Sequence, residues 1–434
     1  MYFGRESDPP AEVRGVPIKE DQMNRKKMAV MLGASVLALA VSACGGGGTG
    51  PDGGASGKTQ MLAWHGYTEA DGKVLDKIVA EFNSSQDACE VNAEAIAWGS
   101  ITEKLVTSLG AGNGPNLVVQ GPDTGLGYVN QGAFQDVQSY YDDPETYTSV
   151  PALHSNLADA VTWDGKTYAI PMGTAAYAVY YNKTMWAEAG LTDADIPKTI
   201  DEMLDVAKKL TKGEKYGIAA PDKDAIFLAT ILHSGGGDFI TDGKVNLNSP
   251  ENIATLEKWQ SAFVDDKVSP TGMDQTAAME LYGSGRAGMI MNGPWQITSS
   301  ESFGIDTGVF GWPSDWVAGV LNYWWSTSMN DSDAEKACAN SFGDFWNSRD
   351  MQILWQDSFY PPNRSDIPAE EFKDPRIATL AEYSQFAHYY MSGVESNFND
   401  ISSTTNALME QVSQGGDVAE LVAAAQTKVE GYIG

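Results

Sequence analysis

Short, unbroken apolar runs alternate along this chain with segments whose apolar residues recur at helical spacing. Residues 61–64 and the Leu117-Val118-Val119 centre of residues 116–120 are runs of the first kind, and residues 74–82 carry apolar side chains every three or four positions. Apolar runs of this length indicate strands buried on both faces, and the periodic segments indicate amphipathic helices. Strands that alternate with such helices predict an α/β fold with largely parallel sheets.

The same alternation extends to the C-terminus. Further strands are expected at residues 167–171, 178–181 and 287–291. Two helices are expected to begin at capping boxes, a pattern of Ser or Thr followed three residues later by Glu, at Thr199 and Ser332. The last helical segment, residues 402–432, is interrupted by Gly415-Gly416. A chain of 434 residues exceeds one ordinary domain, so two lobes are expected.

The N-terminal segment has the features of a targeting signal. Residues 24–27 are basic, and residues 28–41 are uncharged and too short to span a bilayer as a stable helix. They lead into Val41-Ser42-Ala43-Cys44, which resembles a lipobox, so a diacylglyceryl group is expected on Cys44. We expect an upstream extension absent from the mature protein, a lipoprotein signal peptide and a Gly-rich tether, at residues 1–22, 23–43 and 44–58.

The formal net charge of −30 limits the partners of the chain. A field of this sign repels phosphate backbones, so no nucleic-acid partner is expected. It tolerates neutral ligands. Two further cysteines, Cys89 and Cys338, leave two states open, a disulfide or two buried free thiols, because sequence does not supply the Cα separation that a bridge requires.

Catalytic motifs are missing from the sequence. None of the four histidines lies in an HExxH arrangement, and no GxSxG elbow occurs. Carboxylates are plentiful, but nothing marks two of them as an acid and a nucleophile. Residues 330–333 could bind calcium, although a helix N-cap is the favoured interpretation. We expect a binding protein with no catalytic residues, no metal and no organic cofactor.

Five segments, in one order along the chain, resemble a known family. Residues 285–295 are similar to the GxxAMxxNGPW segment of sugar-binding proteins related to maltose-binding protein, and residues 164–171 to the family's DGKxYAxP strand. Residues 180–183 match its YYNK element. Residues 112–116 resemble its GxxPD turn, with Asn116 in place of Asp, and residues 360–364 resemble a late loop.

The resemblance implies a two-lobed periplasmic-binding-protein-like fold with an interlobe ligand cleft and several hinge strands. The first lobe would comprise residues 59–169 and 313–358, and the second residues 170–312 and 359–434. The chain would cross between the lobes near residues 169–171, 310–313 and 359–362. Such a protein would be an extracytoplasmic, lipid-anchored monomer on the outer face of the cell membrane. It would capture an oligosaccharide and deliver it to an ABC permease.

A sugar-binding cleft needs aromatic rings for the C–H face of a pyranose and polar groups for its hydroxyls. Trp295, after the buried strand and Gly293-Pro294, is the strongest candidate for stacking. By the resemblance, or by position after a strand, the other candidate ligand contacts are Trp64, His65, Asp123, Tyr177, Trp324, Trp325, Tyr360 and Arg364. One of Trp324 and Trp325 is expected to line the site and the other to pack, while Arg364 could instead brace the hinge. The abundance of aromatic residues favours plant-derived β-linked manno- or xylo-oligosaccharides.

Three other functions stay open from the sequence. A peptide, a polyamine or another small solute could occupy the same cleft. A surface lipoprotein glycosidase would need two carboxylates that face each other at one site. A structural adhesin is disfavoured because no internal repeat is visible.

Replacing Cys44 with Ser should release the protein from the membrane fraction, because the acyl chains on Cys44 would be its anchor. Fractionation of cells that express either form measures this. An equally membrane-bound Cys44→Ser protein would mean that another region tethers the chain.

Overall fold

The computed structural model describes residues 57–68, 70–241, 244–391 and 397–433, which belong to one compact unit. The expected signal peptide, Cys44 and nearly all of the tether lie outside the described residues. Within these ranges, no helix is both long enough and apolar enough to span a membrane.

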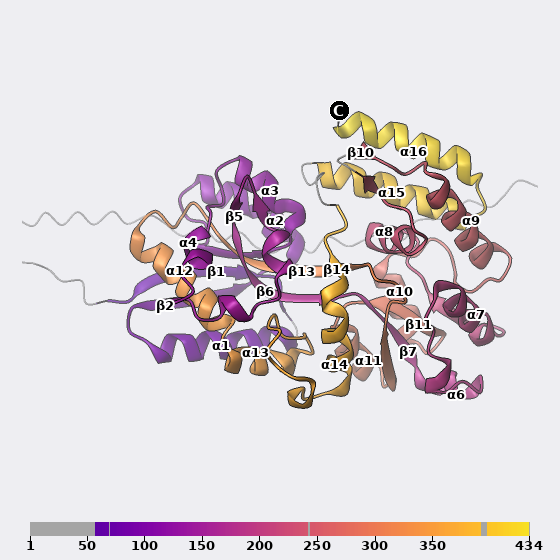
Figure 1. The fold of residues 1–434 in the computed structure, drawn as a ribbon, viewed down its shortest axis with the longest axis horizontal. Coiled ribbons are helices and arrows are strands. Elements are labelled where there is room, and N and C mark those ends of the chain that lie inside the picture. The colour runs from indigo at the N-terminus through magenta and orange to yellow at the C-terminus, as the bar shows by residue number, and fades with distance from the viewer. Residues whose placement is uncertain (1–56, 69, 242–243, 392–396, 434) are drawn as a thin grey trace, which may run out of the picture. The chain divides into compact units, whose positions relative to one another are not determined.

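The first of two large sheets has the strand order β14-β13-β3-β1-β2, and β6 also pairs with β13. Its strands are β1 (Thr59–His65), β2 (Cys89–Ala95), β3 (Leu117–Gln120), β6 (Ala169–Ala176), β13 (Val317–Ser326) and β14 (Ala387–His388). The helices packed around this sheet are α1 (Ala70–Ser85), α2 (Trp98–Gly110), α3 (Pro122–Asn130), α4 (Gln138–Asp142), α5 (Asn156–Asp159), α12 (Asp333–Trp346) and α13 (Arg349–Trp355). We call this body the first lobe; in Figure 1, the orange helices α12 and α13 lie among its indigo and violet elements.

The second large sheet has the order β12-β7-β11-β8. Its strands are β7 (Ala178–Asn182), β8 (Tyr216–Ala219), β11 (Ala287–Asn292) and β12 (Thr307–Gly311). The helices of this second lobe are α6 (Lys183–Glu188), α7 (Ile200–Leu210), α8 (Ala225–Ser234), α9 (Pro250–Val264), α10 (Gln275–Gly283), α11 (Gln296–Ser302), α14 (Pro375–Tyr383), α15 (Phe398–Ser413) and α16 (Val418–Ile433). Figure 1 shows α15 and α16, in yellow, packed beside α9. Two small hairpins complete the fold, β4 (Thr162–Trp163) with β5 (Lys166–Thr167) and β9 (Ile240–Thr241) with β10 (Lys244–Val245).

The two-lobed α/β fold expected from the sequence is confirmed, but the expectation of largely parallel sheets is wrong. β1 runs parallel to β2 and β3, whereas β13 is antiparallel to β3 and β6, and β7 is antiparallel to β11 and β12. Parallel neighbours need a crossover of a dozen or more residues. Only Tyr177 separates β6 from β7, and this short link leads from the first sheet directly into the second.

The expected helix boundaries follow from local hydrogen bonds. The Ser332 hydroxyl accepts from the backbone N–H of Glu335 at 3.2 Å, and the Glu335 carboxylate accepts from the N–H of Ser332 at 3.0 Å. This capping box opens α12 and confirms the N-cap interpretation of residues 330–333. At Thr199 the hydroxyl likewise accepts from Glu202, but the Glu202 carboxylate accepts from Lys198 instead. Between α15 and α16, Gly415 takes a φ of 89°, which a residue with a Cβ rarely adopts.

β6 and β13 form an antiparallel pair that reaches from one lobe to the other. Asn322 pairs with Gly173 and Tyr323 with Pro171, so the register shifts and Met172 is an extra residue on β6. Pro171 has no N–H to donate, and proline in a sheet is typical of such bulges. The carbonyl of Met172 accepts from the Trp346 indole at 2.7 Å and from the Asn363 amide at 3.1 Å.

The third predicted crossing, residues 359–362, lies beside this bulge. Asn363, which is fully buried, also donates to the Asn347 side chain at 2.9 Å and accepts from the Thr174 hydroxyl at 2.8 Å. Phe359 has a φ of 64°, an unusual value for a bulky residue, so the chain bends sharply as it enters the crossing. The residues at which the lobes begin and end stay a prediction.

A disulfide joins Cys89, the first residue of β2, to Cys338 on α12. The Cα atoms are 5.9 Å apart, within the range of ordinary bridges. The bond therefore fastens a helix to the sheet that it covers, inside the core of the first lobe.

Replacing both cysteines with Ala should lower the free energy of unfolding by about 2–4 kcal/mol, because the bridge restricts the unfolded chain. Urea melts of the double variant and of reduced wild-type protein measure this, and the two should agree. Thiol titration of unfolded, unreduced protein that lacks Cys44 should find no free thiol; two thiols would contradict the bridge.

Candidate functional site

The first wall of the site begins where β1 ends, at the carboxyl edge of the first sheet. After His65 the chain turns through Gly66 to Tyr67, whose ring lies edge-on to those of Trp98, Trp355 and Tyr360 at centroid distances of 5.3, 5.6 and 6.0 Å. In open α/β sheets, loops at this edge line the ligand crevice. The aromatic cluster therefore stands where a ligand is expected.

Trp98, the first residue of α2, is the exposed member of this wall. Its side chain remains 40% exposed, whereas Tyr67 is buried. A Cβ on Gly66 would meet the Trp98 ring at 2.0 Å, so only glycine lets the ring lie against the backbone there. Trp98 thus offers a fixed, partly open ring.

The opposite wall is built from the end of β11 and from α11 in the second lobe. Asn292, fully buried, accepts from the N–H of Gly293 at 2.9 Å and donates to Gln296 at 2.7 Å, which shapes the turn before α11. Trp295 follows this turn, half-buried and edge-on to Tyr177 at 6.0 Å. At the end of α11, Phe303 remains 52% exposed.

Between the walls lies the hinge strand β13. The Asn322 amide donates to the Tyr67 hydroxyl at 2.8 Å, directly at the bulge. Both residues line a cavity of about 810 Å³ between the lobes, together with Gly66, Thr68, Asp71, Trp98, Thr276, Met279, Glu280, Trp295, Ser299, Ser302, Phe303, Val320 and Tyr360. This volume is in the usual range for small-molecule sites.

A second cavity of about 410 Å³ continues the first, since Trp98, Val320 and Asn322 line both. It adds Asp123, in the first turn of α3, and Tyr177, which is buried at the end of β6. Burial raises the pKa of the Tyr177 phenol far above its ordinary value, so this group stays protonated. We call the two connected cavities the cleft.

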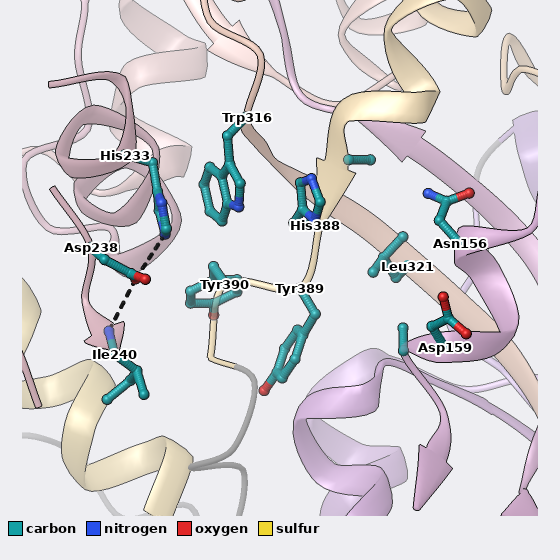
Figure 2. Close-up of a pocket in the computed structure, with 12 residues that line it drawn as sticks. Asn156, Asp159, His233, Asp238, Ile240, Trp316, Leu321, His388, Tyr389 and Tyr390 are labelled. Carbon is teal, nitrogen blue, oxygen red and sulfur yellow. Dashed lines mark hydrogen bonds and ion pairs between the residues drawn. The ribbon is translucent and has the colours of Figure 1, made fainter. Parts of the chain in front are cut away.

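A third cavity, of about 390 Å³, adjoins the cleft and shares Leu321, Tyr389 and Tyr390 with it (Figure 2). Asn156 and Asp159 line it from the first lobe, while His233 and Asp238 line it from the second. The Trp316 ring stacks on His233 at 3.6 Å and faces His388 at 5.6 Å.

Burial lowers the pKa of both imidazoles next to Trp316. For His233, the Asp238 carboxylate, whose oxygen lies 3.2 Å from the imidazole, opposes this shift, while His388 adds to it. For His388, burial is the sole cause. Both rings are therefore neutral near pH 7.

Four of the predicted contacts lie where the sequence placed them. Trp295 and Tyr360 line the larger cavity of the cleft, and Asp123 and Tyr177 line the smaller one. They come from segments far apart in the chain that the two lobes and the hinge bring together. Their contact with a ligand stays a prediction.

Three candidate tryptophans lie in cores, although only one of Trp324 and Trp325 was expected to pack. Trp324 packs with the α1 and α12 side of the sheet, while Trp64 and Trp325 pack with the α2 and α3 side. Trp325 stacks between Phe134 and Trp163 at 4.9 and 6.0 Å. Strand side chains alternate between two faces, and helices cover both, so these rings point into cores and not beyond the strand end.

His65 and Arg364 also lie away from the cleft. His65, at the end of β1, is buried, and burial lowers its pKa. Arg364 donates to both Asp366 oxygens at 2.8 and 2.6 Å and to the Asn347 carbonyl at 2.9 Å. It therefore braces the third crossing, the alternative that the sequence left open.

The sequence analysis missed Tyr67, Trp98 and Phe303. Tyr67 lies two residues beyond the end of β1, so it is not covered by the helices that cover Trp64 and lines the cleft instead. Trp98 and Phe303 stand at helix ends, where sequence periodicity is least informative. The signal available for both was an aromatic residue next to glycine, Trp98-Gly99 and Phe303-Gly304. Among the residues that the structure describes, no group of three or more His, Cys, Asp or Glu could hold a metal ion.

Known proteins share both sequence and fold with this chain. A family model described as bacterial extracellular solute-binding protein matches residues 77–379. The maltotriose-binding protein of Pyrococcus abyssi is 27% identical over 259 residues, 58% of this chain and 53% of the relative. The galactooligosaccharide-binding protein of Bacillus subtilis is 25% identical over 300 residues, 65% of this chain and 67% of the relative. The solved cyclic alpha-maltosyl-1,6-maltose binding protein of Arthrobacter globiformis has a TM-score of 0.75 at 22% identity and covers 87% of this chain and 99% of its own.

The free energy of unfolding should fall as the pH drops from 7.5 to 5.5. Burial lowers the pKa of His65, His154, His233 and His388, so the unfolded chain takes up protons near its ordinary value of about 6.5 before the folded chain does. Each such proton contributes at most about 1.4 kcal/mol per pH unit. Urea melts at several pH values measure the slope, which should be smaller for His65→Gln. A constant or rising free energy would contradict the buried neutral imidazoles.

Proposed function

Because the chain belongs to the family of bacterial extracellular solute-binding proteins, we propose that it captures an oligosaccharide outside the cytoplasm and delivers it to the permease of an ABC importer. The single observation that carries the choice of ligand is a pair of exposed rings. Trp98 and Phe303 line one cavity from opposite lobes while remaining 40% and 52% exposed. Exposed rings on two sides of one cavity suit the C–H faces of a sugar.

Polar groups of the cleft suit the hydroxyls of a sugar. Asp71 and Glu280 line the larger cavity, Asp123 lines the smaller one, and Asn322 stands between the two. Carboxylates accept hydrogen bonds from hydroxyls, and an amide both donates and accepts. Buried hydroxyls without partners would be costly, so such groups decide which sugar fits.

The relatives support a carbohydrate ligand. Two of them are named for maltotriose and for galactooligosaccharide, and a solved structure of the same fold is named for a cyclic maltosyl-maltose. For this chain we propose a β-linked plant oligosaccharide of the manno or xylo type, on its aromatic content alone. Calorimetry of the mature protein against a panel of oligosaccharides tests both the carbohydrate ligand and the preference for the manno or xylo type. If the protein bound no member of the panel, the proposed function would be overturned.

Closure of the lobes would bury the ligand. The moving bodies in this proposal are residues 59–169 with 313–358 and residues 170–312 with 359–434, and β6 and β13 would bend between them. The closed state gains contacts that the open state lacks, so ligand shifts the population toward it. The protein would act as a monomer, tethered through lipid on Cys44, and would release its ligand chemically unchanged.

A glycosidase is the second candidate, because Asp71 and Glu280 line the same cavity from opposite lobes. Two carboxyl groups that flank a glycosidic bond are the usual machinery of glycoside hydrolysis. Incubation of the protein with the tightest ligand, followed by chromatography of the sugars, separates the two functions. Fragments that disappear in a Glu280→Gln variant would favour the enzyme.

Trp295→Ala should weaken oligosaccharide binding by roughly 30- to 1000-fold, because truncating a well-packed aromatic anchor costs about 2–4 kcal/mol. The free energy of unfolding should change by much less than the roughly 3–5 kcal/mol of a truncated core aromatic. Calorimetric titrations and urea melts without ligand measure the two effects.

Trp324→Ala is the matched control. Trp324 is fully buried against Phe342 and Trp346 in the first lobe. This variant should lose roughly 3–5 kcal/mol of stability and keep its affinity wherever it stays folded. Unchanged affinity and large destabilisation for Trp295→Ala would instead make Trp295 a core residue.

A further inference from the structure

Carboxylates line the cleft and the third cavity from both lobes. The first lobe supplies Asp71, Asp123 and Asp159, and the second supplies Asp238 and Glu280. No Lys or Arg is among the described residues that line these three cavities. Among the same described lining residues, the basic side chains are His233 and His388, which burial keeps neutral near pH 7.

The absence of Lys and Arg from the described lining of these cavities is not explained by the small number of Lys and Arg in the chain. Lys209, Lys212, Lys215 and Arg286 gather around one pocket of the second lobe. That pocket lies at the amino ends of β8 and β11, while Trp295 and the cleft lie beyond the carboxyl end of β11. Six strand residues span roughly 20 Å, so these cations stand well apart from the ligand.

We infer that the cleft admits neutral and amine-bearing oligosaccharides and rejects those that carry carboxylate, sulfate or phosphate groups. The inference rests on the proposed function, and it narrows the class of ligand. Charge complementarity of this kind acts mainly by excluding wrong partners.

Closure strengthens the discrimination. As the lobes exclude water, the effective dielectric around the ligand falls from about 80 toward about 20, so the repulsion between like charges grows about fourfold. A hydroxyl group of a neutral sugar can donate a hydrogen bond to a carboxylate of the cleft. An ammonium group donates a stronger, charge-assisted bond at the same place. An anionic group has no donor to offer and finds no cation within the described lining.

Two matched pairs of oligosaccharides test the inference by calorimetry at pH 7, where both imidazoles are neutral. β-1,4-Manno-oligosaccharides and β-1,4-mannuronate oligomers of equal length differ at C6, where a carboxylate replaces a hydroxymethyl group. Cello-oligosaccharides and glucosamine oligomers differ at C2, where an amine replaces a hydroxyl. We expect the mannuronate to bind about 10- to 100-fold more weakly than its neutral partner, the scale of one charged hydrogen bond. The glucosamine oligomer should bind at least as tightly as the cello-oligosaccharide.

Protein variants assign the effect to the cleft. Glu280→Gln and Asp71→Asn should each narrow the ratio between neutral and anionic affinities, by about 3- to 10-fold on the same scale. Glu188→Gln is the control, because it removes the same charge from the second lobe at the pocket of cations. The ratio should be unchanged in this variant. Added salt should narrow the ratio in wild-type protein.

The outcomes separate the inference from the proposed function. Equal or tighter binding of the mannuronate would overturn the inference and leave the oligosaccharide function intact. A ratio that Glu188→Gln changes as much as Glu280→Gln does would also overturn it, because the net charge would then be the cause. Binding of no oligosaccharide, neutral or charged, would overturn both.

Discussion

One antiparallel pair of strands determines the arrangement of this protein. β6 and β13 run through both lobes, and the extra residue Met172 interrupts their register at the point where the lobes meet. Its carbonyl has no ladder partner, and a buried carbonyl without a partner is costly. Trp346 and Asn363 satisfy it from the first lobe and from the third crossing. The bulge of the first crossing and the third crossing are therefore joined at a single irregular peptide.

The tryptophans divide according to their distance from a strand end. Trp64, Trp324 and Trp325 lie within strands that helices cover on both faces, so each ring enters one core or the other. Trp98 and Trp295 lie beyond strand ends, where glycine lets a ring rest on the backbone. The same side chain thus stabilises a lobe in one position and faces the cleft in the other.

Much of the fold was predictable from the sequence, because apolar runs, capping boxes and glycine breaks act locally. The segment with Gly293-Pro294 also predicted the position of Trp295, since a turn after a buried strand points toward the sheet edge. The mixed direction of the strands was not predictable, because it depends on pairing between segments far apart in the chain, as when β13 pairs with β3 and β6. Nor was the exposure of Phe303 at the end of α11, because helical periodicity says least about side chains at helix ends. Trp64 and His65 are the last two residues of β1 and are buried, so the chain leaves the sheet only after both of them, at Gly66.

Asn322 is part of both the cleft and the strand pair that joins the lobes. It lines the cleft and bonds Tyr67, and it is also the last residue in register before the bulge. A ligand that rearranges this amide would pull directly on the torsions of the bending strand, without any relay. In the proposed mechanism, affinity and lobe closure would share this residue, so a substitution at Asn322 would change both the sugar that is recognised and the ease with which the lobes close. Substitutions that change the recognised sugar would be tolerated more readily at the exposed rings Trp98 and Phe303 than at Asn322.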